Sequence, residues 1–122
     1  MVDLPWRDSE EGNEVEPERH ADAVVVCEFQ DGTVAVYDEE VVIDRVPRSR
    51  FVDTTIPAPE ITGVDYSEGI TVGYLQIEQA GVEADRGGLF SDPVNRNTLH
   101  FGRGDRDCAR TARDAILERA RG

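Results

Sequence analysis

The sequence contains no lysine, although its 122 residues include 13 basic side chains, all of them arginine, and 26 acidic ones. The formal net charge is −13. A surface covered in Asp and Glu with Arg in place of Lys is typical of extreme halophiles, where concentrated salt screens the self-repulsion of so large a charge. The sequence therefore predicts a protein of a halophile-type, archaeal cytoplasm. The alternative is an acidic protein from a GC-rich mesophile.

Long apolar runs are also missing. No stretch approaches the roughly 20 residues that a membrane-spanning helix needs, and the acidic first residues contain no apolar segment of signal-peptide length. Both features favour a cytoplasmic protein. Cys27 and Cys108 lie far apart and form no C-x-x-C spacing. In a reducing cytosol we expect both to be buried free thiols, with a disulfide between them as the alternative.

Motifs that carry chemistry are absent as well. His20 and His100 lie in different contexts, and the glycines near Arg86 and Arg103 lack the spacing of a phosphate-binding loop. Carboxylates are so frequent that a pair of them carries no information. We therefore predict no catalytic residues, no metal, no cofactor and no enzymatic activity. The acidic charge also argues against a nucleic-acid partner, which needs a basic patch.

The chain divides into a tail and one domain. Residues 1–21 are acidic and poor in large apolar side chains, which predicts a flexible segment. Trp6, in the tripeptide LPW, is either a docking motif for another protein or a side chain that packs back on its own domain. Residues 22–122 are long enough for a single domain with its own core.

The domain reads as short strands followed by one helix. β-branched and aromatic runs are separated by Gly, Pro and acidic turns, as in an antiparallel meander. The expected strands are AVVVCEF (23–29), TVAVYD (33–38), VVIDRV (41–46), FVDTTI (51–56), EITGVDY (60–66), ITVGYLQIEQ (70–79) and TLHF (98–101). Residues 105–122 then change to a helical period, with Asp105 as the N-cap. The fold class is α+β, mostly β.

Four motifs follow one another along the strands. They consist of Gly32, Tyr37, Glu39, Val41 or Val42, Ile43 and Arg45, then Ile56, Pro57, Ile61 and Val64, then Gly73, Tyr74, Leu75 and Gln76, and finally Asn97, Thr98, Leu99 and Phe101. Together these motifs resemble the pleckstrin-homology-like (PH-like) domain family of bacterial and archaeal proteins of unknown function. The resemblance covers about residues 23–120.

The resemblance implies a partly open barrel of about seven antiparallel strands, capped by a C-terminal helix. It implies no catalytic residues. Members of this family often carry a second copy of the domain or a short C-terminal helical appendage, and this chain has neither. Any function that depends on such an appendage is therefore not expected here.

Arginines supply the candidate partner-binding residues. Arg106, Arg110 and Arg113 form one stripe along the predicted helix. Ion pairing within the helix and to the barrel rim accounts for such a stripe, at about 0.2–0.5 kcal/mol a pair. The alternative is a face that binds a partner through planar, bidentate guanidinium groups.

Residues 44–51, DRVPRSRF, concentrate three more arginines. Pro47 and Ser49 predict a turn between two strands, which leaves Arg48 and Arg50 as unexplained charge. We predict a non-enzymatic interaction or scaffold module that binds a protein partner or itself, through open sheet edges or the helix. The alternative is a binder of an anionic lipid head group or small anion through residues 45–50, and only that alternative involves a membrane surface.

Overall fold

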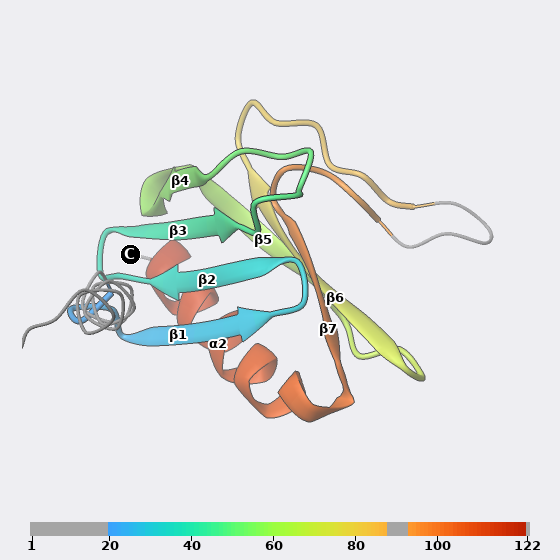
Figure 1. Ribbon diagram of the computed structural model, residues 1–122. Coiled ribbons are helices and arrows are strands. Elements are labelled where there is room, and N and C mark those ends of the chain that lie inside the picture. The colour runs from blue at the N-terminus through green and yellow to red at the C-terminus, as the bar shows by residue number, and fades with distance from the viewer. Residues whose placement is uncertain (1–19, 88–92, 122) are drawn as a thin grey trace, which may run out of the picture.

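The computed structural model describes residues 20–87 and 93–121. Two antiparallel sheets pack around one core, and a single helix follows them (Figure 1). The elements in chain order are β1 (Val25–Phe29), β2 (Gly32–Val36), β3 (Glu40–Arg45), β4 (Thr54–Pro57), the 3-10 turn η1 (Ala58–Glu60), β5 (Ile61–Ser67), β6 (Val72–Gln79), β7 (Thr98–Gly102), the 3-10 turn η2 (Arg103–Asp105) and α2 (Arg106–Ala120). The mostly-β fold class with a C-terminal helix is confirmed.

The first sheet has the strand order β1-β2-β3-β4, and the second has the order β5-β6-β7. Alternation along each strand sends the apolar side chains inward, where Val34, Ile43 and Leu75 are fully buried. Phe101 lies between the two sheets, with its ring centroid 5.3 Å from that of Phe29. The core therefore lies between the sheets, as the strand pattern predicts.

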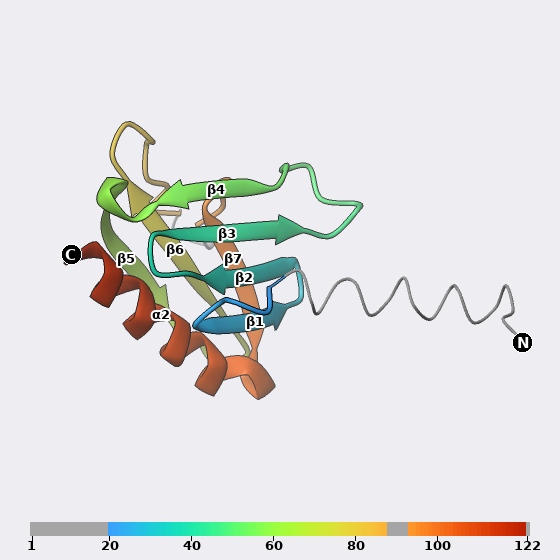
Figure 2. The ribbon, with the colours of Figure 1, turned by 90° about the vertical axis from the view of Figure 1, so that its left-hand side faces the viewer.

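Helix α2 closes one side of this core (Figure 2). Its buried positions are mostly small, with Ala109, Ala112 and Ala115 joined by Ile116. Alanine side chains let the helix backbone approach the sheets closely. Asp105 stands at the N-cap, as predicted, but its side chain makes no capping hydrogen bond.

The connection between β6 and β7 folds back over the outer face of β6. The Gln76 side chain, 1% exposed, donates to the carbonyl of Asp85 at 2.7 Å and accepts from the Asp85 backbone N–H at 2.9 Å. Asn97, also buried, donates to the Ile77 carbonyl at 3.1 Å. The Gln76 amide is satisfied through both its nitrogen and its oxygen, and Asn97 is held through its Nδ2 group, whereas Asn97 Oδ1 is buried without a hydrogen-bond donor. These contacts fix the path of the connection.

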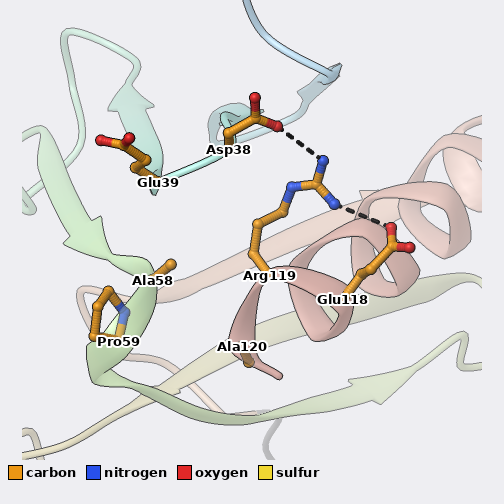
Figure 3. Close-up of a pocket in the computed structure, with 7 residues that line it drawn as sticks. All are labelled: Asp38, Glu39, Ala58, Pro59, Glu118, Arg119 and Ala120. Carbon is orange, nitrogen blue, oxygen red and sulfur yellow. Dashed lines mark hydrogen bonds and ion pairs between the residues drawn. The ribbon is translucent and has the colours of Figure 1, made fainter. Parts of the chain in front are cut away.

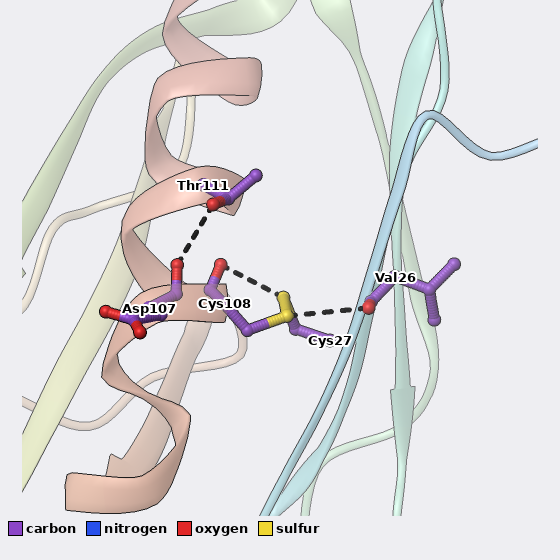
Figure 4. Close-up of a disulfide and its surroundings, with 5 residues drawn as sticks. All are labelled: Val26, Cys27, Asp107, Cys108 and Thr111. Carbon is purple, nitrogen blue, oxygen red and sulfur yellow. Dashed lines mark hydrogen bonds between the residues drawn. A yellow bond between two sulfur atoms is a disulfide. The ribbon is translucent and has the colours of Figure 1, made fainter.

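Cys27 and Cys108 are joined in a disulfide, with their Cα atoms 5.9 Å apart. The prediction of two free thiols is therefore wrong. The bond ties the middle of β1 to the first turn of α2 across 81 residues of sequence (Figure 4). The Cys108 sulfur also lies 3.6 Å from the Val26 carbonyl oxygen. Since a disulfide sulfur carries no hydrogen, this is a close contact and not a hydrogen bond.

Most outer strand edges are covered or short. Side chains of the first sheet cover the edge of β7: Asp31 accepts the His100 backbone N–H at 3.0 Å, and Arg45 donates to the Thr98 carbonyl at 2.9 Å. The disulfide holds α2 against β1. Strand β4 has four residues and ends at Pro57. Covered edges, short strands and proline all discourage edge-to-edge pairing.

Candidate functional site

Arg48 and Arg50 lie in the connection between β3 and β4, at the end of the first sheet far from the C-terminus of α2 (Figure 2). A turn forms there as predicted: the Ser49 N–H donates to the Val46 carbonyl at 3.0 Å, and Ser49 Oγ accepts the Phe51 N–H at 3.0 Å. Both arginines are exposed. Within residues 20–87 and 93–121, neither pairs with a carboxylate, and Arg50 lies over the Phe51 ring at 5.1 Å.

This connection also exposes an apolar side chain. Val52 is 78% exposed, next to Phe51, whose ring has the Arg45 guanidinium 5.2 Å from its centroid. The loop tip therefore presents two unpaired positive charges together with an exposed valine. Guanidinium groups combined with apolar area suit a contact surface more than a purely solvated corner. We call residues 46–53 the basic loop.

Arg45, the strand arginine beside the basic loop, donates hydrogen bonds within the fold, although its buried Nε has no acceptor. One Nη donates to the carbonyls of Arg96 at 2.8 Å and Thr98 at 2.9 Å. Burial lowers the pKa of Arg45, opposed by the charges of Asp31 and Asp53. The side chain fastens β3 to the segment before β7, so it is structural.

The three candidate arginines of α2 all contact their own chain, along the hairpin between β5 and β6. Arg106 donates to the Gly69 and Ile70 carbonyls at 2.9 and 3.1 Å, and Arg110 donates to Glu68 at 2.8 Å. Tyr66 completes the group. Its hydroxyl donates to Glu68 at 2.9 Å.

The Tyr66 hydroxyl and, after it, the arginine charges hold the pKa of Glu68 below its usual value. Arg113 lies over the Tyr66 ring at 4.7 Å and pairs with Asp114 at 3.0 Å. The arrangement fits ion pairing within the domain. Trp6 lies outside the described residues.

Each described histidine is paired with a carboxylate, which the sequence did not indicate. His20 lies 2.7 Å from Asp44 and 2.6 Å from the Tyr37 hydroxyl. Through these contacts His20 packs on the domain. His100 lies 2.8 Å from Asp31 through Nδ1 and 3.1 Å from the Pro93 carbonyl through Nε2. These pairs attach one segment of the fold to another.

A cavity of about 630 Å³ opens where α2 ends (Figure 3). Three separate segments line it: the turn between β2 and β3, the turn η1 and the last residues of the helix. The lining residues are Asp38, Glu39, Ala58, Pro59, Glu118, Arg119 and Ala120. Ala58, Pro59 and Ala120 supply apolar surface, while three carboxylates and one guanidinium give a formal charge of −2.

Arg119, which lines this cavity, already pairs with carboxylates of its own chain. Its guanidinium contacts Asp38 at 3.2 Å and Glu118 at 3.0 Å, and it donates to the Ala115 carbonyl at 3.4 Å. Glu39 is exposed, and no ion pair joins it to a described residue. A second, shallower hollow of about 340 Å³ shares Asp38 and Glu39 and adds Asp22 and Glu40. We call the larger cavity, with these carboxylates around it, the acidic cavity.

The helix end adds to this polarity. The last carbonyl groups of an α-helix lack intrahelical partners and favour a nearby cation. Carboxylates, helix carbonyls and an apolar floor together suit a cationic group on an apolar stem. Sequence reasoning missed the site because its walls come from segments far apart in the chain. The only signal was the acidic run Asp38-Glu39-Glu40 at a turn.

Other kinds of site find no support in the described part of the chain. No group of three His, Cys, Asp or Glu side chains there is placed to hold a metal ion. None of the described helices combines the length and the apolar character of a membrane span. No family model, curated protein or solved structure matches the sequence.

Proposed function

We propose that the protein is a non-catalytic, PH-like interaction module that works as a scaffold by associating with itself. The observation that carries the proposal is the acidic cavity, a concave site with an apolar floor and a surplus of carboxylates. Concave, partly apolar sites with a few charged groups are where proteins bind ligands, and a protruding side chain of another copy can fill such a site. The PH-like assignment itself rests on the motifs of the sequence.

The proposal places self-association at the ends of the first sheet. Strand edges were the expected route, but the edges of β1 and β7 are covered and β4 is short. The basic loop and the acidic cavity remain open at opposite ends. The mass of the particle in solution tests the proposal, measured by light scattering after size-exclusion chromatography at several protein and salt concentrations. A monomer under every native condition would contradict it.

Salt adaptation belongs to the same proposal. With 26 acidic residues and no lysine, the chain repels itself at low ionic strength. We expect thermal melts in multimolar KCl to show higher stability than melts in dilute buffer, and equal or greater stability in dilute buffer would refute the adaptation. A halophile-type cytoplasm as the compartment rests on this composition alone, because the Cys27–Cys108 disulfide removes the redox argument for it.

A second candidate function is the binding of an anionic head group or small anion at the basic loop. The observation that favours it is the combination of unpaired Arg48 and Arg50 with Val52, which is 78% exposed. Acidic neighbours such as Asp53 weaken the local positive potential. Flotation with vesicles that contain anionic lipid tests this function. Absence of binding, or binding that Arg48→Glu leaves unchanged, excludes it.

A further inference from the structure

Two open features of the chain are complementary in charge and shape. The acidic cavity carries a formal charge of −2 from its lining residues and has an apolar floor. The basic loop carries Arg48 and Arg50, which pair with no described carboxylate, and exposes Val52. The negative charge of the cavity and the positive charge of the loop are opposite in sign, and each feature also offers apolar surface. The basic loop is the one place in the described chain where two exposed arginines without carboxylate partners lie together with an exposed apolar side chain.

The two features lie at opposite ends of the first sheet. Strand β3 begins at Glu40, beside the acidic cavity, and ends at Arg45, beside the basic loop (Figures 1 and 2). Six residues of extended strand span about 20 Å. The basic loop of a chain therefore cannot reach the acidic cavity of the same chain, whereas the basic loop of another copy can.

We propose that the basic loop of one copy docks in the acidic cavity of the next, an inference that rests on the self-association proposed above. Arg48 and Arg50 bring guanidinium groups to Glu39 and to the outer oxygens of Asp38 and Glu118. Val52 and the arginine stems cover the floor made by Ala58, Pro59 and Ala120. Arg119 stays with its own carboxylates and sets the depth to which the loop enters.

The positions of the two surfaces determine the kind of assembly. A contact between two different surfaces is heterologous, and because the basic loop and the acidic cavity lie at opposite ends of the molecule, repeated contacts build an open chain of molecules instead of a closed dimer. The ion pairs weaken in concentrated salt, while apolar contact persists. Salt also screens the mutual repulsion between chains that each carry a net charge of −13. Association is therefore measured from the lowest salt in which the fold is intact upward, and the average mass of the particle rises steadily with protein concentration.

Charge reversal at each end tests the docking. The loop variant is Arg48→Glu with Arg50→Glu, which reverses the charge of those two side chains. The cavity variant is Glu39→Arg, which brings the formal charge of the cavity lining from −2 to 0, with the milder Glu39→Gln beside it in case the change disturbs folding. Matched controls are Arg86→Glu, at a side chain 70% exposed, and Glu83→Arg, at another exposed residue. Circular dichroism melts establish that each variant folds, and sedimentation velocity measures association.

We expect each reversal to weaken association at least about tenfold, as for other close interfacial charge pairs, and both controls to associate as the wild type does. Combining both changes in one chain restores long assemblies, because the introduced carboxylates of the loop then face the introduced arginine of the cavity. Mixing the two single-end variants also gives long assemblies, in which the two variants alternate, because both contacts between unlike variants pair opposite charges.

The outcomes separate this inference from the proposed function. If the wild type associates and neither reversal changes it, the docking is wrong while self-association stands. If the reversals act but the combined variant does not recover, the two ends do not contact each other, and the docking is again wrong. A wild type that is monomeric throughout overturns both.

Discussion

The arginines of α2 and those of the basic loop carry the same kind of charge but differ in the contacts that they make. Arg106, Arg110 and Arg113 contact carbonyls, carboxylates or a ring of their own domain. Arg48 and Arg50 pair with no described carboxylate. The sequence ranked both groups as candidate binding residues, and burial and pairing now distinguish them. The arginines of α2 are used in contacts within the domain, whereas those of the basic loop are exposed and have no described carboxylate partner.

The largest expected effect on the free energy of unfolding comes from the disulfide that holds α2 against β1. Replacing Cys27 and Cys108 together by alanine removes a link that closes a loop across 81 residues. In the chain-entropy account this lowers the free energy of unfolding by about 4 kcal/mol. Urea titration in multimolar KCl measures it, with the wild type plus a thiol reductant as a second arm. A variant as stable as the oxidised wild type would mean that the disulfide does not stabilise this side.

Arg45 and Arg48 make the sharpest matched pair, because they are three residues apart in one segment. Arg45→Gln leaves the carbonyls of Arg96 and Thr98 without their donor. We expect a loss of about 2 kcal/mol in the free energy of unfolding. Arg48→Gln is expected to change it by less than about 0.5 kcal/mol. If the two variants lost similar amounts of unfolding free energy in the same urea titration, Arg45 could no longer be called structural and Arg48 unpaired.

Changing Arg106, Arg110 and Arg113 together to Gln has a smaller effect, since the ion pairs of Arg110 and Arg113 and most of the carbonyl contacts of Arg106 are exposed. We expect a loss of about 1 kcal/mol for the triple variant, with the association constant unchanged. Thermal melts and sedimentation velocity on the same samples measure the two quantities. Lost association with an unchanged melt would instead make this stripe the interface.

The smallest effect on stability is expected in the basic loop. Arg48→Gln with Arg50→Gln should leave the unfolding free energy within about 0.5 kcal/mol of the wild type while it weakens self-association. The measurements are urea titration and sedimentation velocity. A destabilised double variant would show that the loop arginines support the fold, and the comparison with α2 would then fail.

Local pattern predicted much of the fold. Leu75 and Ile77 alternate with polar neighbours in the sequence, and both are buried on the inner face of β6. The same alternation places Gln76 on the opposite face of the strand. That residue is nevertheless 1% exposed, because the connection after β6 folds back over it. Such a contact depends on the path of a long loop, and no local period encodes it.

Long-range contacts account for the other differences. The disulfide joins residues whose spacing suggested nothing, since β1 and α2 meet only in the folded chain. The acidic cavity likewise needs the β2–β3 turn, η1 and the end of α2 in one place. His20 was assigned to the flexible tail, yet it contacts Tyr37 and Asp44. What sequence reasoning did find was the basic loop, because its turn and its surplus charge are both local.

The mass of the wild-type particle tests the central claim most directly. Light scattering after size-exclusion chromatography, from dilute to concentrated protein and at the lowest salt in which circular dichroism shows the native fold, gives that mass. We predict an average that exceeds the 13.5 kDa of one chain and grows with concentration. A species of 13.5 kDa at every concentration would contradict the claim.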